Sequence, residues 1–136
     1  MAALTITAAS VGLTSVDDGR FRKVKFGQAM TAGQSCYKNA NGKYYLADAT
    51  ASGTAKVAGI VYHGAATNAF GHIIERGTLD IGATIAVGET YIQGDVGGAI
   101  HAIGDSTTGW YKTVIATGTT TSSIYINITA SGIVVP

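Results

Sequence analysis

Residues 31–62 read TAGQSCYKNANGKYYLADATASGTAKVAGIVY and contain two turn motifs that separate three short extended runs. The turns are residues 31–33 (TAG) and 39–42 (NANG), whose Gly and Asn accept a positive φ at little steric cost. The extended runs are residues 34–37, 43–46 and 56–62. Runs of this length between tight turns predict a meander of short β-strands.

The rest of the chain repeats this pattern. No window of 11 residues has the i, i+3, i+4, i+7 spacing of an amphipathic helix, and turn motifs recur about every 8 to 12 residues. Further strands are expected near residues 4–7, 20–26, 71–77, 79–87, 91–93, 99–103, 110–116 and 123–129. The sequence therefore predicts an all-β fold of eight to ten strands, a jelly-roll-like β-sandwich, with a small open β-barrel as the alternative.

A chain of 136 residues is expected to form a single domain over residues 1–136, with residues 1–16 as a candidate extended arm. Only 12% of the residues are charged, about half the usual share, and 46% are hydrophobic. A surface with so little charge suits burial against partner subunits, which favours a homo-oligomer.

The charge and cysteine content exclude some functions. A net charge of +1 gives no field that favours nucleic acid or an anionic membrane, and no run approaches the ~20 apolar residues of a membrane span. Seven of the nine Lys and Arg residues lie before residue 61, whereas five of the eight acids follow it. The single cysteine excludes an internal disulfide and fits a reducing cytoplasm.

Residues 20–26, RFRKVKF, carry four of the nine basic residues. In a strand, Arg22, Val24 and Phe26 share one face, and Phe21, Lys23 and Lys25 share the other. Neither face is purely apolar. This segment is therefore predicted to be an edge strand or a contact strip for an acidic partner.

The candidate catalytic and metal-binding residues are few. His63, His72 and His101 lack the spacing of a metal site, and Cys36 is read as a buried small hydrophobe rather than a nucleophile. Asp17 and Asp18 are read as a turn, with calcium binding as the weaker alternative. We therefore expect no enzyme activity, no metal and no cofactor.

Residues 104–106, GDS, match the start of the GDSL block of esterases, but Thr107 follows in a β-rich context, so a turn is expected. The seven tyrosines and Trp110 could line a sugar platform, although such residues more often cap a β core.

Four segments together resemble a known family: TAGQ with Tyr37, NGKYYLADA at 41–49, VAGIV with HGA at 57–65, and GETYIQGDVGGAI at 88–100. Their order resembles that of the small cement or decoration proteins on the capsids of tailed bacteriophages. The resemblance extends from about Thr31 to Ile103. Its motifs are turns and strands without a catalytic signature.

The resemblance implies a structural virion protein on the outer surface of the capsid, assembled in the host bacterial cytoplasm. Such a protein bridges major capsid protein subunits and stabilises the expanded head. The alternative is a carbohydrate-binding or adhesion module of a head fibre or tail.

The contact residues can be assigned on this interpretation. The expected capsid-contact residues are Leu4, Ile6, Arg20, Arg22, Lys23 and Lys25. The subunit contacts of a dimer or trimer are expected on the low-charge C-terminal strand and tail, at Ile124, Tyr125, Ile126, Ile128, Ile133 and Val135. The alternative is that these residues only complete the sheets of their own domain.

Overall fold

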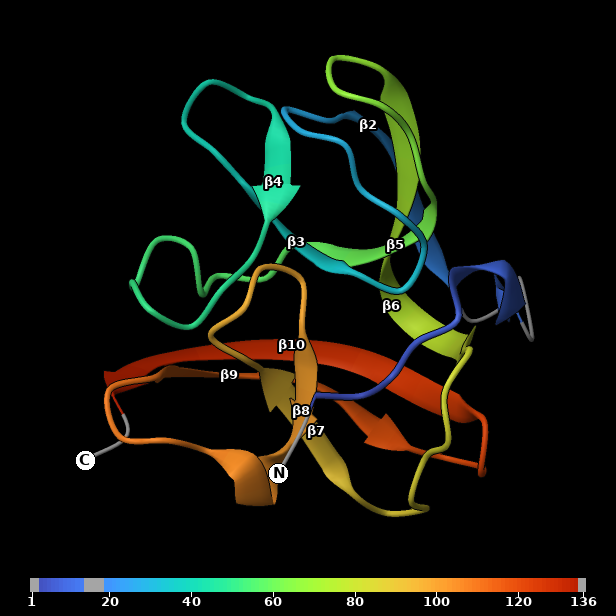
Figure 1. The fold of residues 1–136 in the computed structure, drawn as a ribbon, viewed down its shortest axis with the longest axis vertical. Coiled ribbons are helices and arrows are strands. Elements are labelled where there is room, and N and C mark those ends of the chain that lie inside the picture. Colours follow the sequence, from blue (N-terminus) through green and yellow to red (C-terminus); the bar gives the residue numbers. More distant parts are fainter. Residues whose placement is uncertain (1–2, 14–18, 135–136) are drawn as a thin grey trace.

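The computed structural model describes residues 3–13 and 19–134, and over these residues the chain folds into ten strands and two short 3-10 turns (Figure 1). The predicted all-β class is confirmed. The elements are η1 (Ala8–Ser10), β1 (Val11–Leu13), β2 (Arg20–Lys25), β3 (Ser35–Lys38), β4 (Tyr44–Leu46), β5 (Gly59–His63), β6 (Phe70–Ile81), β7 (Thr90–Gln93), β8 (Ile100–Ala102), η2 (Ile103–Asp105), β9 (Tyr111–Gly118) and β10 (Ser123–Val134).

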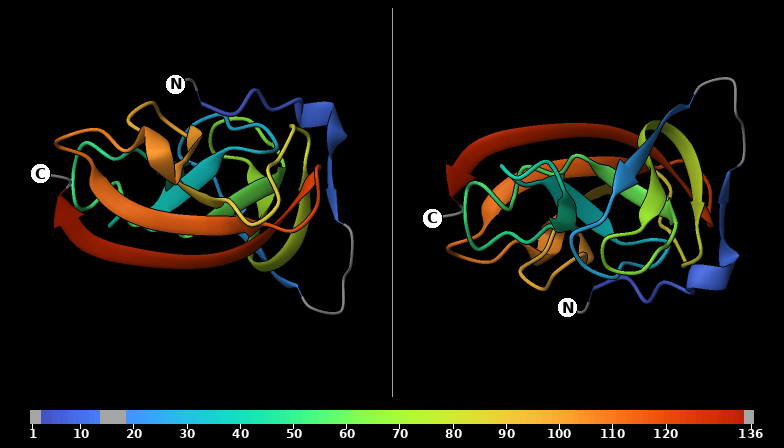
Figure 2. Two further views of the ribbon diagram at one scale, coloured as in Figure 1. Left: turned by 90° about the horizontal axis from the view of Figure 1, so that it is seen from below. Right: turned by 90° about the horizontal axis from the view of Figure 1, so that it is seen from above.

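All named strand pairs are antiparallel and belong to one curled open sheet with the order β4-β3-β5-β6-β10-β9-β7-β8. Strands β1 and β2 pair with β6 outside this order. Figure 1 shows two lobes, with β2 to β5 in the upper one and β7 to β10 in the lower one, and Figure 2 shows the sheet curling between them. This half-barrel agrees with the predicted sandwich or open-barrel class.

Strand β6 connects the two lobes. Ile73 and Ile74 are neighbours on opposite faces, and both are 0% exposed, so β6 is buried on both sides. Further along the strand, Leu79 and Ile81 join Ile74 in the largest core cluster, whereas Ile73 belongs to the second cluster. The face of β6 that meets the largest core therefore changes from an even-numbered position to odd-numbered ones. The change lies between Ile74 and Leu79, where the pairing with β2 skips Glu75 and where Gly77 has a φ of +117°. The sequence predicted separate runs before and after residue 77, whereas the structure has one bent strand.

The core of the described residues has three parts. The largest lies between the lobes, the second covers the other face of β5 and β6, and the third lies under Trp110. The main members of the first are Ile60, Ile74, Leu79, Ile81, Tyr91, Ile100, Ile115, Ile124 and Ile126, and those of the second are Val24, Phe26, Met30, Cys36, Tyr44, Val61 and Ile73.

The predicted turn at residues 39–42 is confirmed as a hairpin, and the glycine-rich residues before β8 form a second hairpin. Residues 39–42 close β3 onto β4, where the Gly42 N–H donates to the Asn39 carbonyl at 2.9 Å and Gly42 has a φ of +84°. Residues 94–99 close β7 onto β8. In both turns a glycine occupies the left-handed region that other residues avoid.

The N-terminal segment packs against its own domain. The Leu4 N–H donates to the Ile100 carbonyl at 2.8 Å, and the Thr7 N–H donates to the Gly82 carbonyl at 2.9 Å. Strand β1 then pairs with β6. The expectation of an extended arm over residues 1–16 is therefore wrong for residues 3–13. Residues 1–2 and 14–16 of the expected arm lie outside the described residues. Asp17 and Asp18, and with them the calcium alternative, also lie outside.

Candidate functional site

The predicted basic strip lies on an exposed sheet edge. Among the described strands, β2 pairs with β6 alone, so its other side is free. This confirms the prediction of an edge strand, and the four cations Arg20, Arg22, Lys23 and Lys25 are all exposed. Charges on a free edge discourage pairing with other chains, which is one structural reason for this sequence.

A carboxylate that the sequence did not connect with the strip lies beside it. Glu75 of β6 lies across from β2, with its Oε1 3.3 Å from Arg22 Nε and 3.7 Å from Arg20 Nε. Both arginines are largely exposed, so each pair contributes about 0–1 kcal/mol to stability. Lys23 and Lys25 form no ion pair with the described residues. These two lysines are therefore the cations most available to a partner.

Next to the lysines lies an aromatic cluster of Phe21, Tyr62, His63 and His72. A register shift between Val61 and His63 leaves one extra residue in β5, so that Tyr62 and His63 both lie opposite His72 of β6. The ring centroids are 5.5 Å apart for Phe21 and Tyr62, and 5.5 Å for His63 and His72. Sequence spacing missed this cluster because a strand bulge has no local signature.

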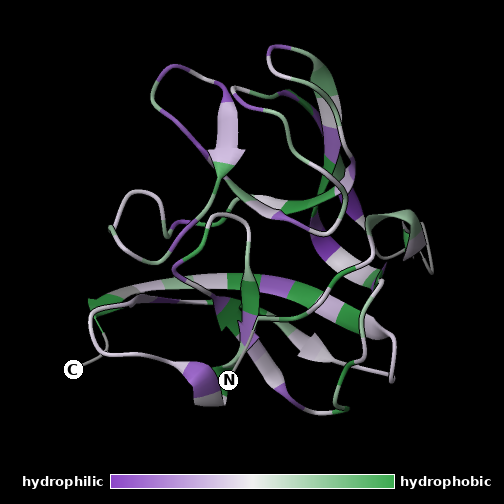
Figure 3. Ribbon diagram, in the orientation of Figure 1, coloured by the Kyte–Doolittle hydropathy of each residue, from purple (hydrophilic) through white to green (hydrophobic). Residues whose placement is uncertain are grey.

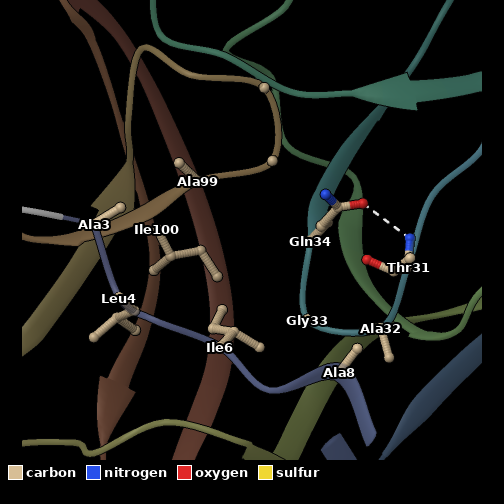
Figure 4. A pocket seen from close by; sticks show the side chains of 12 residues that line it. Ala3, Leu4, Ile6, Ala8, Thr31, Ala32, Gly33, Gln34, Ala99 and Ile100 are labelled. Atoms are coloured by element: carbon tan, nitrogen blue, oxygen red, sulfur yellow. Dashed lines mark hydrogen bonds between the residues drawn. The ribbon is translucent and has the colours of Figure 1, made fainter.

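The N-terminal segment borders a cavity of about 250 Å³ (Figure 4). Figure 4 shows Leu4 and Ile6 on one side and the loop of Thr31 and Gln34 opposite. Leu4 and Ile6 are half-buried and pack against the core, so little of either side chain is left for a capsid contact. None of the lining residues is titratable. The cavity is lined by Ala3, Leu4, Ile6, Ala8, Thr31, Ala32, Gly33, Gln34, Gly97, Gly98, Ala99 and Ile100.

Strand β10 divides into a buried part and an exposed part. Ile124 and Ile126 are 0% exposed and complete the core of their own chain, so the prediction of subunit contacts at these two side chains is wrong. The strand alternates as predicted, and Figure 3 shows hydrophobic and hydrophilic residues alternating along it. The cause of the error is that alternation gives the faces of a strand but not what covers each face.

The remaining subunit-contact candidates differ in exposure. Tyr125 and Ile128 are half-buried, and the Tyr125 hydroxyl accepts a hydrogen bond from Arg76 Nε at 3.3 Å. Ile133 is 68% exposed. Val135 lies outside the described residues.

The GDS segment at 104–106 forms a turn, as predicted. Asp105 ends η2, and the Ser106 hydroxyl donates to the Ile103 carbonyl at 2.6 Å. Asp105 Oδ2 lies 3.2 Å from Nδ1 of His101, whose ring packs against Trp110. The Ser106 hydroxyl is therefore directed to backbone rather than to the histidine, which does not fit a serine nucleophile.

Cys36 is a buried hydrophobe, as predicted. Its side chain is 0% exposed, and burial raises the pKa of its thiol to about 12. The thiol therefore stays protonated at neutral pH and is a poor nucleophile. Within residues 3–13 and 19–134, no three His, Cys, Asp or Glu residues lie close enough to hold a metal ion together.

Comparison with known proteins identifies no family: no family model matches the chain, and no curated protein matches its sequence. Over the described residues, no helix has the length and apolar character needed to cross a bilayer.

Proposed function

We propose that the chain is a structural decoration protein on the outer surface of a tailed-phage capsid, where it bridges major capsid protein subunits of the expanded head. The proposal begins from the resemblance of residues 31–103 to the cement proteins. It includes assembly in the host cytoplasm and no enzymatic activity, nucleic acid partner or membrane partner.

The observation that carries the proposal is the exposed edge strand β2. Four cations lie on this strand, and among the described residues they pair only with the carboxylate of Glu75. Such a strip favours an acidic surface and fixes the orientation of docking through charge complementarity. Lys23 and Lys25 are the main contacts of this strip, because Arg20 and Arg22 already form ion pairs with Glu75.

The mechanical effect follows from mass action. A protein that binds only the expanded lattice stabilises that state, and the stabilising free energy grows with the logarithm of the ratio of free protein concentration to Kd. Each contact can be weak, because oligomers on a symmetric lattice raise the effective concentration of every further contact.

The direct test is co-sedimentation of the purified protein with expanded, undecorated heads of the phage that encodes it. We expect saturation at a fixed ratio of bound chains to major capsid subunits, and weaker binding to unexpanded heads. Absence of binding to heads in both states would refute the proposal.

Charge reversal on β2 tests the docking surface. Lys23→Glu with Lys25→Glu is expected to lower head binding at least tenfold at low salt, and less at high salt where screening already weakens the contact. Lys38→Glu is the matched control, because Lys38 is also exposed but lies on β3. Equal binding by both variants would eliminate β2 as the contact.

The alternative function, a carbohydrate-binding or adhesion module, is favoured by one observation. Phe21, Tyr62, His63 and His72 gather on one face, and clustered rings are the usual platform for sugars. Screening against the glycans of the host cell surface tests it. Binding that is lost in Tyr62→Ala, together with no binding to heads, would replace the decoration role by this one.

A further inference from the structure

His63 and His72 are a directly opposed pair on neighbouring strands. They are cross-strand partners in the register of β5 and β6, where opposed Cβ atoms are typically about 4.5–5.5 Å apart. His63 is exposed and His72 is half-buried, so solvent reaches the pair. Neither imidazole forms a hydrogen bond or an ion pair with the described residues.

We propose that His63 and His72 form a binding site for a divalent transition metal ion such as Zn²⁺ or Ni²⁺. Neutral imidazole is a preferred ligand of both ions. The site is independent of any role on a capsid, since it uses only two side chains of the isolated chain.

The spacing of the rings supports shared coordination. Two imidazoles bound to one tetrahedral Zn²⁺ through Zn–N bonds of about 2.1 Å have ring centres about 5 Å apart. The observed separation of the two ring centroids is 5.5 Å. The rings meet edge to face, at an interplanar angle of 71°. Shared coordination requires each side chain to turn one ring nitrogen toward a common point.

Two neighbouring side chains affect the histidine pair in opposite ways. Lys23 of β2 lies opposite His72 in the register, but its Nζ is 5.4 Å from the centroid of the Phe70 ring. Tyr62 packs against both histidines, with ring centroids 4.9 Å from His63 and 5.8 Å from His72. Tyr62 therefore supports the rings from one side, whereas Lys23 weakens metal binding through its charge.

His101 differs in each of these respects. It is 8% exposed, and its Nδ1 lies 3.2 Å from the Asp105 carboxylate. It is thus a structural histidine, and it serves as an internal control because the chain has three histidines in all.

The experiment is calorimetric titration of ZnCl₂ and NiCl₂ into the full-length, untagged, chelator-treated protein at neutral pH. Wild type is expected to bind both ions. His63→Ala and His72→Ala are each expected to raise the Kd at least about tenfold, because removing a metal ligand weakens binding more than removing a residue that only hydrogen-bonds to a ligand. Lys23→Gln is expected to strengthen binding about twofold by removing a nearby charge, and Lys38→Gln to leave it unchanged.

Two readouts separate the site from nonspecific effects. Thermal unfolding without metal shows that each variant is folded, and Zn²⁺ should raise the Tm of wild type but not of the His63→Ala/His72→Ala double variant. One ion per chain means that water completes the coordination, and one ion per two chains means that a second copy supplies the other imidazoles. No binding by wild type, or unchanged binding by the double variant, would overturn the proposal.

Discussion

Cys36 illustrates how burial alone sets the chemistry of a residue. Its thiol is enclosed by the second core and lies 3.5 Å from the Gly59 carbonyl, to which it donates a weak hydrogen bond. Removal from water, more than any neighbouring charge, raises its pKa from 9.0 to about 12. The native state therefore holds the thiol proton more tightly than the unfolded state does.

This difference predicts a pH-dependent stability. Above the unfolded pKa of about 9 the unfolded chain releases the thiol proton and the native chain does not, so stability falls as pH rises toward 12. The loss attributable to Cys36 is about 1 kcal/mol per pH unit in that window. Urea unfolding of wild type and Cys36→Ala at neutral pH and near pH 10 measures it. A difference between the two proteins that does not change with pH would contradict the prediction.

Gln93 is a buried polar residue that joins three segments. Its side chain is 0% exposed. The amide nitrogen donates to the Ala47 carbonyl at 2.8 Å and to the Gly94 carbonyl at 3.0 Å. The amide oxygen accepts a hydrogen bond from the Ser35 hydroxyl. Because no water reaches these buried groups to replace a lost partner, losing one of these hydrogen bonds costs more free energy of folding than losing a hydrogen bond at the surface.

We expect Gln93→Ala to destabilise the fold by about 3 kcal/mol, through a cavity and an unpaired Ser35 hydroxyl. Ser35→Ala should cost about 1 kcal/mol, since Gln93 keeps both donated bonds. The midpoints of urea unfolding give both values. Equal costs would show that the hydroxyl contact alone accounts for the effect.

At the scale of the element, the bend in β6 decides how the two lobes meet. Gly77 has a φ of +117°, where a side chain is strained. The bend lets Ile74 and Leu79 face the same core although they are an odd number of residues apart.

Gly77→Ala is therefore expected to cost about 1–2 kcal/mol of stability. Gly12→Ala in β1 is the matched control, because its added Cβ meets nothing within 4 Å and its φ is not in the left-handed region. Thermal unfolding of the two variants decides the question. A larger loss at Gly12 would mean that the bend does not depend on the glycine conformation.

At the scale of the whole molecule, two of the free edges of the sheet have opposite character. β2 carries four cations, whereas residues 128–134 of β10 carry no charge. Residues 128–134 pair with β9 on one side, and on the other side no described strand pairs with them. Two cationic edges repel each other, but two neutral edges do not. The neutral edge therefore fits contact with another copy of the chain.

If the chain forms dimers or trimers through this edge, Ile133→Lys should lower the oligomer mass without loss of stability, because Ile133 is 68% exposed. Val96→Lys is the control, since Val96 is 66% exposed in the β7–β8 hairpin. Light scattering after size exclusion gives the mass. An identical mass for wild type and Ile133→Lys would place the oligomer contact elsewhere.

The sequence by itself determined the all-β class, the two hairpins and the edge character of β2. These features depend on neighbouring residues: glycine and asparagine at the turns, alternation along each strand, and a run of charges. The burial of Cys36 was also predicted, because the residue lies in a strand-like run with no helix N-terminus nearby to activate the thiol.

Only the tertiary structure decided which strands became neighbours, because pairing depends on contacts between residues far apart in the chain. It buried Ile124 and Ile126, brought Glu75 to Arg22, and placed His63 opposite His72 through a bulge. Alternation of apolar and polar residues along a strand shows which side chains share a face, but not which part of the molecule covers that face. For this reason the strip of charges was visible in the sequence, whereas the pair of histidines was not.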